Sequence, residues 1–276
     1  MSLNSMHAAS RDALVDAEHR LDGVLGDPAV DPATVGDELF GVARLLRDEV
    51  SLRRAAADPS VSAEARQQLL RSLLDGKVGE QVGQVIETVV GSRWSNPREL
   101  RDGVRSLAVT ATLVAAERAG TLESVEDELF GVARAVSNSA ELDLALSDER
   151  APAQSRRELV QRLFGEKIGP ISLALVEQIV SDPHGRGVER QLDELSELAA
   201  RRRNQSVAHV VSASPLTSEQ RDALSAKLDR IYGKPITLHV EIDPGVLGGI
   251  VVKVGDEVID GSSAGRIMAL RGQMAS

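Results

Sequence analysis

One short motif in the sequence has the spacing of a hydrolase nucleophile. Gly261, Ser263 and Gly265 form the pattern G-x-S-x-G between an expected strand and an expected helix, as in a nucleophile elbow. Such a serine needs a histidine base, which in this class of enzyme follows it in the chain, and no histidine follows His239. We therefore interpret the motif as a turn that caps a helix. A small serine hydrolase using Ser263 is kept as the alternative hypothesis.

Metal and nucleotide sites are not predicted either. The chain has no cysteine, and its five histidines show none of the spacings H-x-H, H-x-x-H or H-E-x-x-H. Gly245, Gly248 and Gly249 do not form a phosphate-binding loop pattern, and glycine there is better explained by close backbone approach at the start of a strand. We expect no catalytic residue, no metal and no cofactor.

The charge balance argues against a nucleic-acid partner. The net charge is −10, from 42 acidic and 32 basic residues, and aromatic residues make up 2% of the chain. Phosphate binding depends on lysine and arginine, and proteins that bind single strands add aromatic platforms. An RNA-associated helical adaptor is therefore only a third hypothesis. The small or apolar run at residues 107–116 is shorter than the roughly 20 residues of a membrane-spanning helix, so membrane contact is expected only through partners.

The elements that would position any site are organised as a repeat. Residues 37–44, with the sequence DELFGVAR, recur letter for letter as residues 127–134, at an offset of 90. The same offset aligns Arg66 with Arg156 and Glu87 with Glu177. An identical run followed by a constant register indicates the duplication of a unit of about ninety residues.

Each unit is predicted to be helical. Apolar residues recur at helical spacing, for example at Leu69, Leu70, Leu73 and Leu74. We expect five or six helices per unit, with residues 97–118 and 187–204 closing the two bundles. Asn96 and Pro97 form a helix start, and Glu99 is placed to complete a capping box.

From Val207 onward the apolar period changes to two. The expected order is strand, helix, strand, strand, strand, helix, and the inner face of the first of these helices is Leu224, Leu228 and Ile231. The predicted fold is mainly α with a small α/β C-terminal domain. Its expected parts are a first helical unit at 1–104, a second bundle at 105–206 and the α/β domain at 207–276.

The C-terminal stretch 239–262, with the residues just after it, resembles the signature of the F-type ATP synthase delta family, which includes the mitochondrial oligomycin-sensitivity-conferring protein. The resemblance covers about residues 105–276 directly and 1–104 only through the repeat. The commonest delta has one bundle, and a doubled one is similar to the lengthened actinobacterial form. The signature residues are Gly248, Gly249, Gly255, Asp256, Asp260, Gly261, Gly265 and Arg266.

This resemblance implies a non-catalytic stator subunit that links the catalytic head to the peripheral stalk. The family's partners are the N-terminal helix of an alpha subunit, held by a bundle, and the C-terminal helices of the b subunits, held by the α/β domain. The implied location is peripheral, on the cytoplasmic face of the bacterial cell membrane. Either bundle could hold alpha, and the second is the one expected to, with candidate anchors at Ile171, Leu175 and Ile179.

Overall fold

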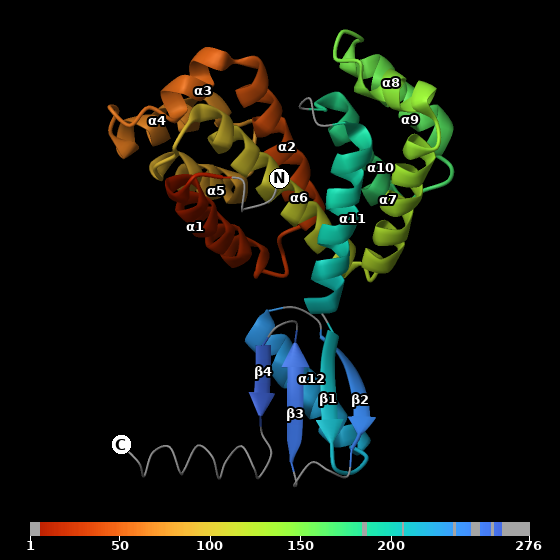
Figure 1. Cartoon of the computed structure of the whole chain (residues 1–276). Helices are drawn as coiled ribbons and strands as arrows, with labels where there is room; N and C mark the ends of the chain where they lie inside the picture. Colours follow the sequence, from red (N-terminus) through yellow and green to blue (C-terminus); the bar gives the residue numbers. More distant parts are fainter. Residues whose placement is uncertain are drawn as a thin grey trace. The chain divides into compact units, whose positions relative to one another are not determined.

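The computed structural model describes residues 6–183, 187–205, 207–233, 236–243, 249–254 and 257–260. The chain divides into two compact units, Met1–Ser196 and Glu197–Ser276. The first is helical, and the second contains a small four-stranded sheet (Figure 1). The predicted class, mainly α with a small α/β domain, is confirmed. The expected last helix falls outside the described residues.

The helices of the first copy of the repeat are α1 (Ala8–Leu25), α2 (Pro32–Asp48), α3 (Val50–Ala56), α4 (Ala63–Leu74), α5 (Glu80–Gly91) and α6 (Pro97–Arg118). Those of the second copy are α7 (Leu122–Ser137), α8 (Ala140–Ser147), α9 (Ala153–Phe164), α10 (Pro170–Ser181) and α11 (Val188–Gln205). The two long helices expected at 97–118 and 187–204 are α6 and α11.

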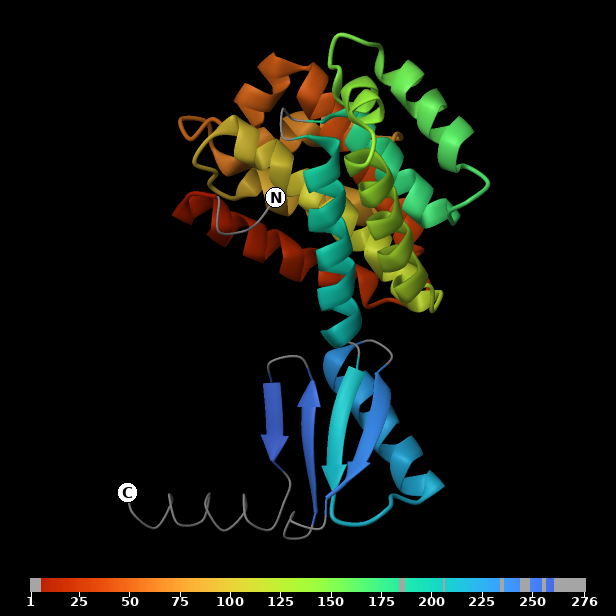
Figure 2. The same cartoon turned by 45° about the vertical axis from the view of Figure 1, so that its right-hand side comes forward.

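The offset of the repeat relates these helices one to one. It carries α2 to α6 onto α7 to α11, and it carries α1 onto residues that lie within α6. Helix α6 packs against α1, α2, α3 and α5 of the first copy and also against α7 and α10 of the second. It runs through the centre of the helical unit (Figures 1 and 2). It thus closes one bundle and opens the next, and the boundary expected between residues 104 and 105 lies inside it.

A carboxylate on α2 holds the start of α5, and its counterpart on α7 holds the start of α10. Glu38 Oε2 accepts a hydrogen bond from the Gly79 amide at 2.7 Å, and Glu128 Oε2 accepts one from the Gly169 amide at 3.0 Å. Gly79 and Gly169 are the N-cap residues of α5 and α10. Amides at a helix start lack partners within the helix, so each carboxylate satisfies a donor that would otherwise be left open.

In each copy a buried arginine links the end of one helix, α5 or α10, to the loop before the preceding helix, α4 or α9. Arg66 on α4 donates to the carbonyl oxygens of Asp58 and Gly91. Arg156 on α9 repeats the device at the corresponding residues, Asp148 and Ser181. A buried guanidinium needs several acceptors, and helix ends supply carbonyls without partners. The duplication therefore preserved hydrogen bonds as well as apolar spacing.

Small residues allow the core of the helical unit to pack closely. A Cβ at Gly36 of α2 would lie 2.5 Å from Oγ1 of Thr112 on α6, so these helices cross where a side chain is missing. A Cβ at Gly103 would lie 2.3 Å from the ring of Trp94, whose indole N–H donates to the Val89 carbonyl at 2.7 Å. Close packing of this kind compensates for the low aromatic content of the core.

Asp31 and Asn96 are the N-cap residues of α2 and α6, and the start at Asn96 follows the prediction with one difference. Asn96 accepts hydrogen bonds from the amides of Arg98 and Glu99, both at 3.0 Å, and Pro97 follows it. The Glu99 carboxylate does not close a capping box, because it pairs instead with Nδ1 of His7 at 2.7 Å. It fastens the N-terminal segment to α6.

The second unit is built on a mixed sheet. Its strands β1 (Val207–Ser212), β2 (Thr237–Ile242), β3 (Ile250–Val254) and β4 (Glu257–Asp260) lie in the order β2-β1-β3-β4. Strand β1 is parallel to β2 and antiparallel to β3, which is antiparallel to β4. Helix α12 (Ser218–Tyr232) connects the parallel pair, as such a pair requires. It begins at Thr217 with a capping box.

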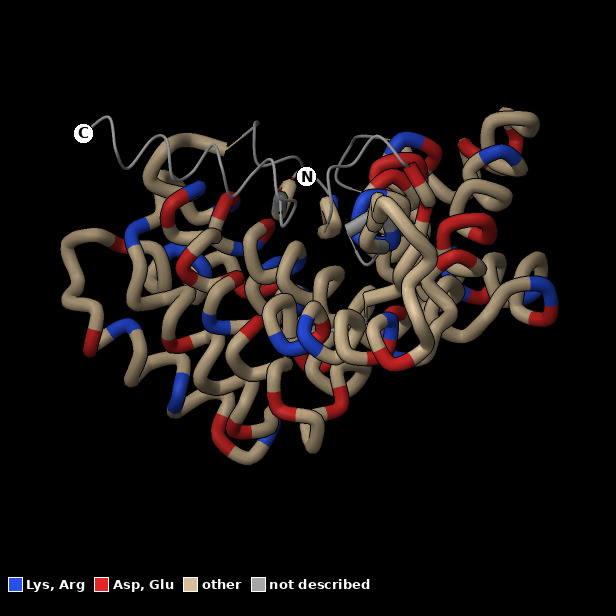
Figure 3. The backbone as a smooth tube through the Cα atoms, turned by 90° about the horizontal axis from the view of Figure 1, so that it is seen from below, with Lys and Arg blue, Asp and Glu red and all other residues tan. Residues whose placement is uncertain are grey.

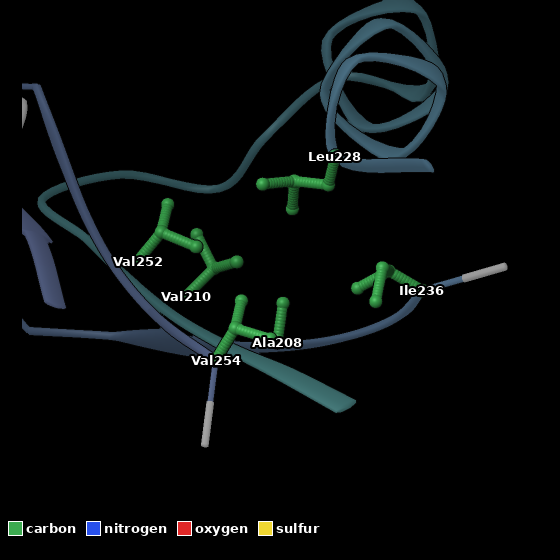
Figure 4. Close-up of a cluster of buried hydrophobic side chains, with 6 residues drawn as sticks. All are labelled: Ala208, Val210, Leu228, Ile236, Val252 and Val254. Atoms are coloured by element: carbon green, nitrogen blue, oxygen red, sulfur yellow. The ribbon is translucent and has the colours of Figure 1, made fainter. Parts of the chain in front are cut away.

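Helix α12 covers one face of this sheet. The shared core is Ala208, Val210, Leu228, Ile236, Val252 and Val254 (Figure 4). Leu224 packs against this core as expected, but Ile231 is 56% exposed. Tyr232 packs there instead, because it lies four residues after Leu228 and so on the same side of the helix.

Candidate partner-binding surfaces

The residues that suggested chemistry do not form a site among the described residues. Ser263 lies outside them. His239 on β2 is exposed and pairs in register with His209 on β1, with ring centroids 5.7 Å apart. Within the described ranges, no group of three or more histidine, aspartate or glutamate side chains is placed to hold a metal ion.

Two of the eight signature residues can be located. Gly249 has φ +91°, which favours glycine, and it comes directly before β3. Asp260 ends β4 and pairs with Val251 of β3. The remaining six lie outside the described residues. The two that are located belong to the turn into β3 and to the last strand, so they help to build the sheet.

The three candidate anchors for an alpha helix do not share an open face. Leu175 and Ile179 are each 1% exposed and pack inside the second bundle, whereas Ile171 is half-buried. The spacing that suggested a docking stripe is equally the spacing of the inner face of a helix. Ile171 alone is accessible to a partner.

The C-terminal end of α10 is covered by α2 of the first copy. Arg44 Nη1 donates to Gln178 Oε1 at 3.1 Å, and Arg47 Nη1 donates to the Ser181 carbonyl at 3.3 Å. A cavity of about 20 Å³ remains between them, lined by Phe40, Ala43, Arg44, Arg47, Arg101, Arg105, Gln178, Ser181 and Asp182. We call this contact between the copies the seam. Burial, with Arg157 and Arg47 nearby, lowers the pKa of Arg44, which remains a cation.

The first bundle carries an open groove between α4 and α5 that the sequence did not lead us to expect. Its volume is about 470 Å³, and Leu70, Leu74, Val78 and Ile86 form its apolar lining. Arg71, Asp75, Glu80 and Glu87 also line it. Arg71 Nη2 pairs with Glu87 Oε1 at 2.7 Å. We call this the α4–α5 groove.

One glycine contributes to the open space of the groove. Gly83 of α5 occupies the repeat position of Leu173 in α10, and a Cβ at Gly83 would have no atom within 4 Å. Leu74 likewise corresponds to the larger Phe164. The signal was therefore present in the aligned copies, as a glycine opposite a leucine inside a helix.

Basic and acidic positions are both spread over the described backbone (Figure 3). Among the described residues, no helix is both long and apolar enough to cross a bilayer.

Comparison with known proteins places the chain in a family. A profile described as ATP synthase delta (OSCP) subunit matches residues 109–274. The chain belongs to this family. "ATP synthase subunit delta" of Streptomyces griseus is 44% identical over 270 residues, which is 98% of this chain and all of the relative. The Nocardia farcinica protein of the same name is 45% identical over 273 residues, again 98% and 100%.

The family profile and the relatives cover different extents of the chain. The profile begins inside α6, so it matches the second bundle and the α/β unit. The two actinobacterial relatives also span the first bundle, so the doubled delta architecture is shared with them. A chain in the Toxoplasma gondii mitochondrial ATP synthase hexamer is 21% identical with a TM-score of 0.32, covering 61% of this chain and 95% of that one.

Proposed function

We propose that the chain is the non-catalytic delta subunit of an F-type ATP synthase, joining the catalytic head to the peripheral stalk. In this role it resists the torque of the rotor during proton-driven ATP synthesis, at the cytoplasmic face of the cell membrane. Membership of the delta family supports the proposal. The observation on which the proposal depends is the α4–α5 groove, because a passive link requires a surface that binds a partner and does not require catalytic groups.

The partner we propose for this groove is the N-terminal helix of an alpha subunit. An amphipathic helix binds such a groove through apolar side chains at i, i+3, i+4 and i+7. Val78 is half-buried and offers apolar contact, while Leu70, Leu74 and Ile86 line the groove but are at most 6% exposed. The exposed Asp75 and Glu80 favour a helix with basic residues on its flanks.

The first bundle is favoured over the second for this partner. In the second bundle Leu175 and Ile179 are buried, and side chains of α2 cover the end of α10. Ile171 would be the remaining anchor. The α4–α5 groove is favoured by its open volume of about 470 Å³, since Val78 is its half-buried apolar side chain and Leu70, Leu74 and Ile86 are themselves almost fully buried.

The b subunits are proposed to contact the α/β unit. Ile242, Val258 and Ile259 are large apolar side chains exposed on its strands. Together with a bundle site, a second weak contact on the same chain raises the effective strength of the whole link. Deletion of residues 207–276 should then release the head from membranes. A head that stayed attached would contradict the stator role.

The substitution Gly83→Leu tests the groove. It places a side chain in open space at the groove floor, so it should block the helix without disturbing the fold. We expect affinity for a peptide of the alpha N-terminus to fall at least about tenfold, as for loss of a central contact. The assay is calorimetric titration of the whole subunit.

Gly23→Leu is the matched control, because Gly23 is also helical and without neighbours within 4 Å of a Cβ. Both variants should gain about 0.8 kcal/mol of stability from helix propensity, and only Gly83→Leu should lose affinity. Undiminished binding by Gly83→Leu would overturn the groove assignment. Loss of binding in Ile171→Glu would assign alpha to the second bundle instead.

A further inference from the structure

The identical octapeptides of the two copies lie in opposite environments. Phe40 on α2 is 3% exposed, whereas Phe130, its counterpart on α7, is 56% exposed. The chain has three phenylalanines, and this one is left on the surface. Since the two helices have the same local sequence, the difference arises from what packs against them.

Phe40 lies in the seam between the two copies. Phe40 lines the seam cavity together with Gln178 and Ser181 of α10, beside the hydrogen bonds that Arg44 and Arg47 donate to that helix. The seam thus shows what the octapeptide face accepts. The phenylalanine makes an apolar contact. The two arginines donate hydrogen bonds, one to a side-chain amide and one to a main-chain carbonyl near the end of a helix.

The same face is repeated on α7 without a cover. Phe130 and Arg134 are both exposed and lie four residues apart, on one side of the helix, as Phe40 and Arg44 do. Ala133 is buried like Ala43, so the helix presents the same side outward. Ser137 replaces Arg47, so one of the two arginine contacts is lost. A third copy of the repeat would be needed to cover α7 in the way that the second copy meets α2. The element that follows the second copy in the sequence is strand β1 instead.

We infer that Phe130 and Arg134 form a docking face, the α7 face, for an amphipathic helix of another subunit in the synthase. That helix packs an apolar side chain on Phe130 and sets a Gln, Asn, Glu or Asp against Arg134, as α10 does with α2. The inference rests on the proposed assembly into the synthase. It adds a contact distinct from the α4–α5 groove.

A second copy of this chain is a poorer occupant. Docking it in the manner of the seam would use α5, the counterpart of α10. There, Thr88 and Gly91 replace Gln178 and Ser181, and Ser92 replaces Asp182. The amide acceptor and the acid are both missing, so Arg134 would meet no matching group. Head-to-tail contact of this kind would also produce open chains of subunits.

Photo-crosslinking in the assembled complex identifies the occupant. p-Benzoylphenylalanine is incorporated at position 130, and at position 40 as the matched control. Position 130 should give a crosslink to a helix of a different subunit, whereas position 40 should give only links within the chain. No product between chains at position 130, or a product only with a second copy, would overturn the inference.

Substitutions give an independent measurement on the same complex. Phe130→Ser with Arg134→Glu should weaken retention of the crosslinked partner at least about tenfold and leave the Tm of the isolated subunit nearly unchanged. Full retention would overturn the inference. If Gly83→Leu still weakened alpha binding in that case, the proposed function would stand and only the α7 face would fail.

Discussion

Replacing the two octapeptide phenylalanines by alanine should have very different effects on stability. Phe40 is buried in the seam, and loss of a buried phenylalanine costs about 3–5 kcal/mol. We expect the lower end, about 3 kcal/mol, because the cavity of about 20 Å³ beside the ring already removes some of its contacts. Phe130 is more than half exposed, so Phe130→Ala should cost about 1 kcal/mol or less.

The pair is matched in sequence, which makes the comparison clean. Both substitutions occur in DELFGVAR on a helix, so the change in intrinsic helix propensity is the same and cancels in the difference. About 2 kcal/mol or more should then remain, and it measures the difference in burial between the two positions.

Urea unfolding of the isolated subunit is the assay. Trp94 is the single tryptophan of the chain and is buried in the first bundle, so its fluorescence reports unfolding there. Far-ultraviolet circular dichroism follows all helices together. The two probes should agree through the helical unit, because α6 packs with both copies. Equal destabilisation by the two variants would refute the reasoning, since the burial of Phe40 in the seam would then contribute nothing to stability.

Three further predictions concern stability, each measured by denaturation of the isolated subunit. Arg156→Met should cost about 3 kcal/mol, because four carbonyl oxygens lose a buried donor. Arg66→Met should cost about half as much, because Arg66 donates to two carbonyl oxygens, and equal losses would contradict this explanation. Gly103→Ala should cost about 2 kcal/mol and shift the emission of Trp94, because its Cβ overlaps the ring; unchanged emission would count against that contact. Asp31→Ala should cost about 1 kcal/mol. The hydrogen bond from Thr34 lowers the pKa of Asp31, so the cap stabilises above about pH 4, and the difference from wild type should shrink as the pH falls below it; a constant difference would contradict the assignment.

Features fixed by nearby residues were predictable from the sequence. The starts of α6 and α12 follow from Asn96 and Thr217, whose side chains reach amides two or three residues away. The strands follow from alternation, and the order strand, helix, strand, strand, strand is confirmed over the described residues. The change of period at Val207 coincides with the first residue of β1.

Features fixed by distant residues were not predictable in the same way. Glu99 is correctly placed for a capping box, but His7 reaches it from the N-terminal segment. Leu175 and Ile179 have the spacing of a docking stripe, but the packing of α10 turns them inward. Periodicity defines which side of a helix is apolar, and it does not say whether that side faces a core or a partner.

Helix α6 packs in both bundles, and an alignment of the two copies does not show this. A duplication suggests two domains joined by a linker, and a flexible linker would let them move independently. Here one helix belongs to both bundles, and the seam adds packing and arginine hydrogen bonds on a second line of contact. Bending between the bundles would therefore require α6 to break or Phe40 to be exposed. In the proposed stator, force applied to either bundle would pass to the other through this shared helix and the seam.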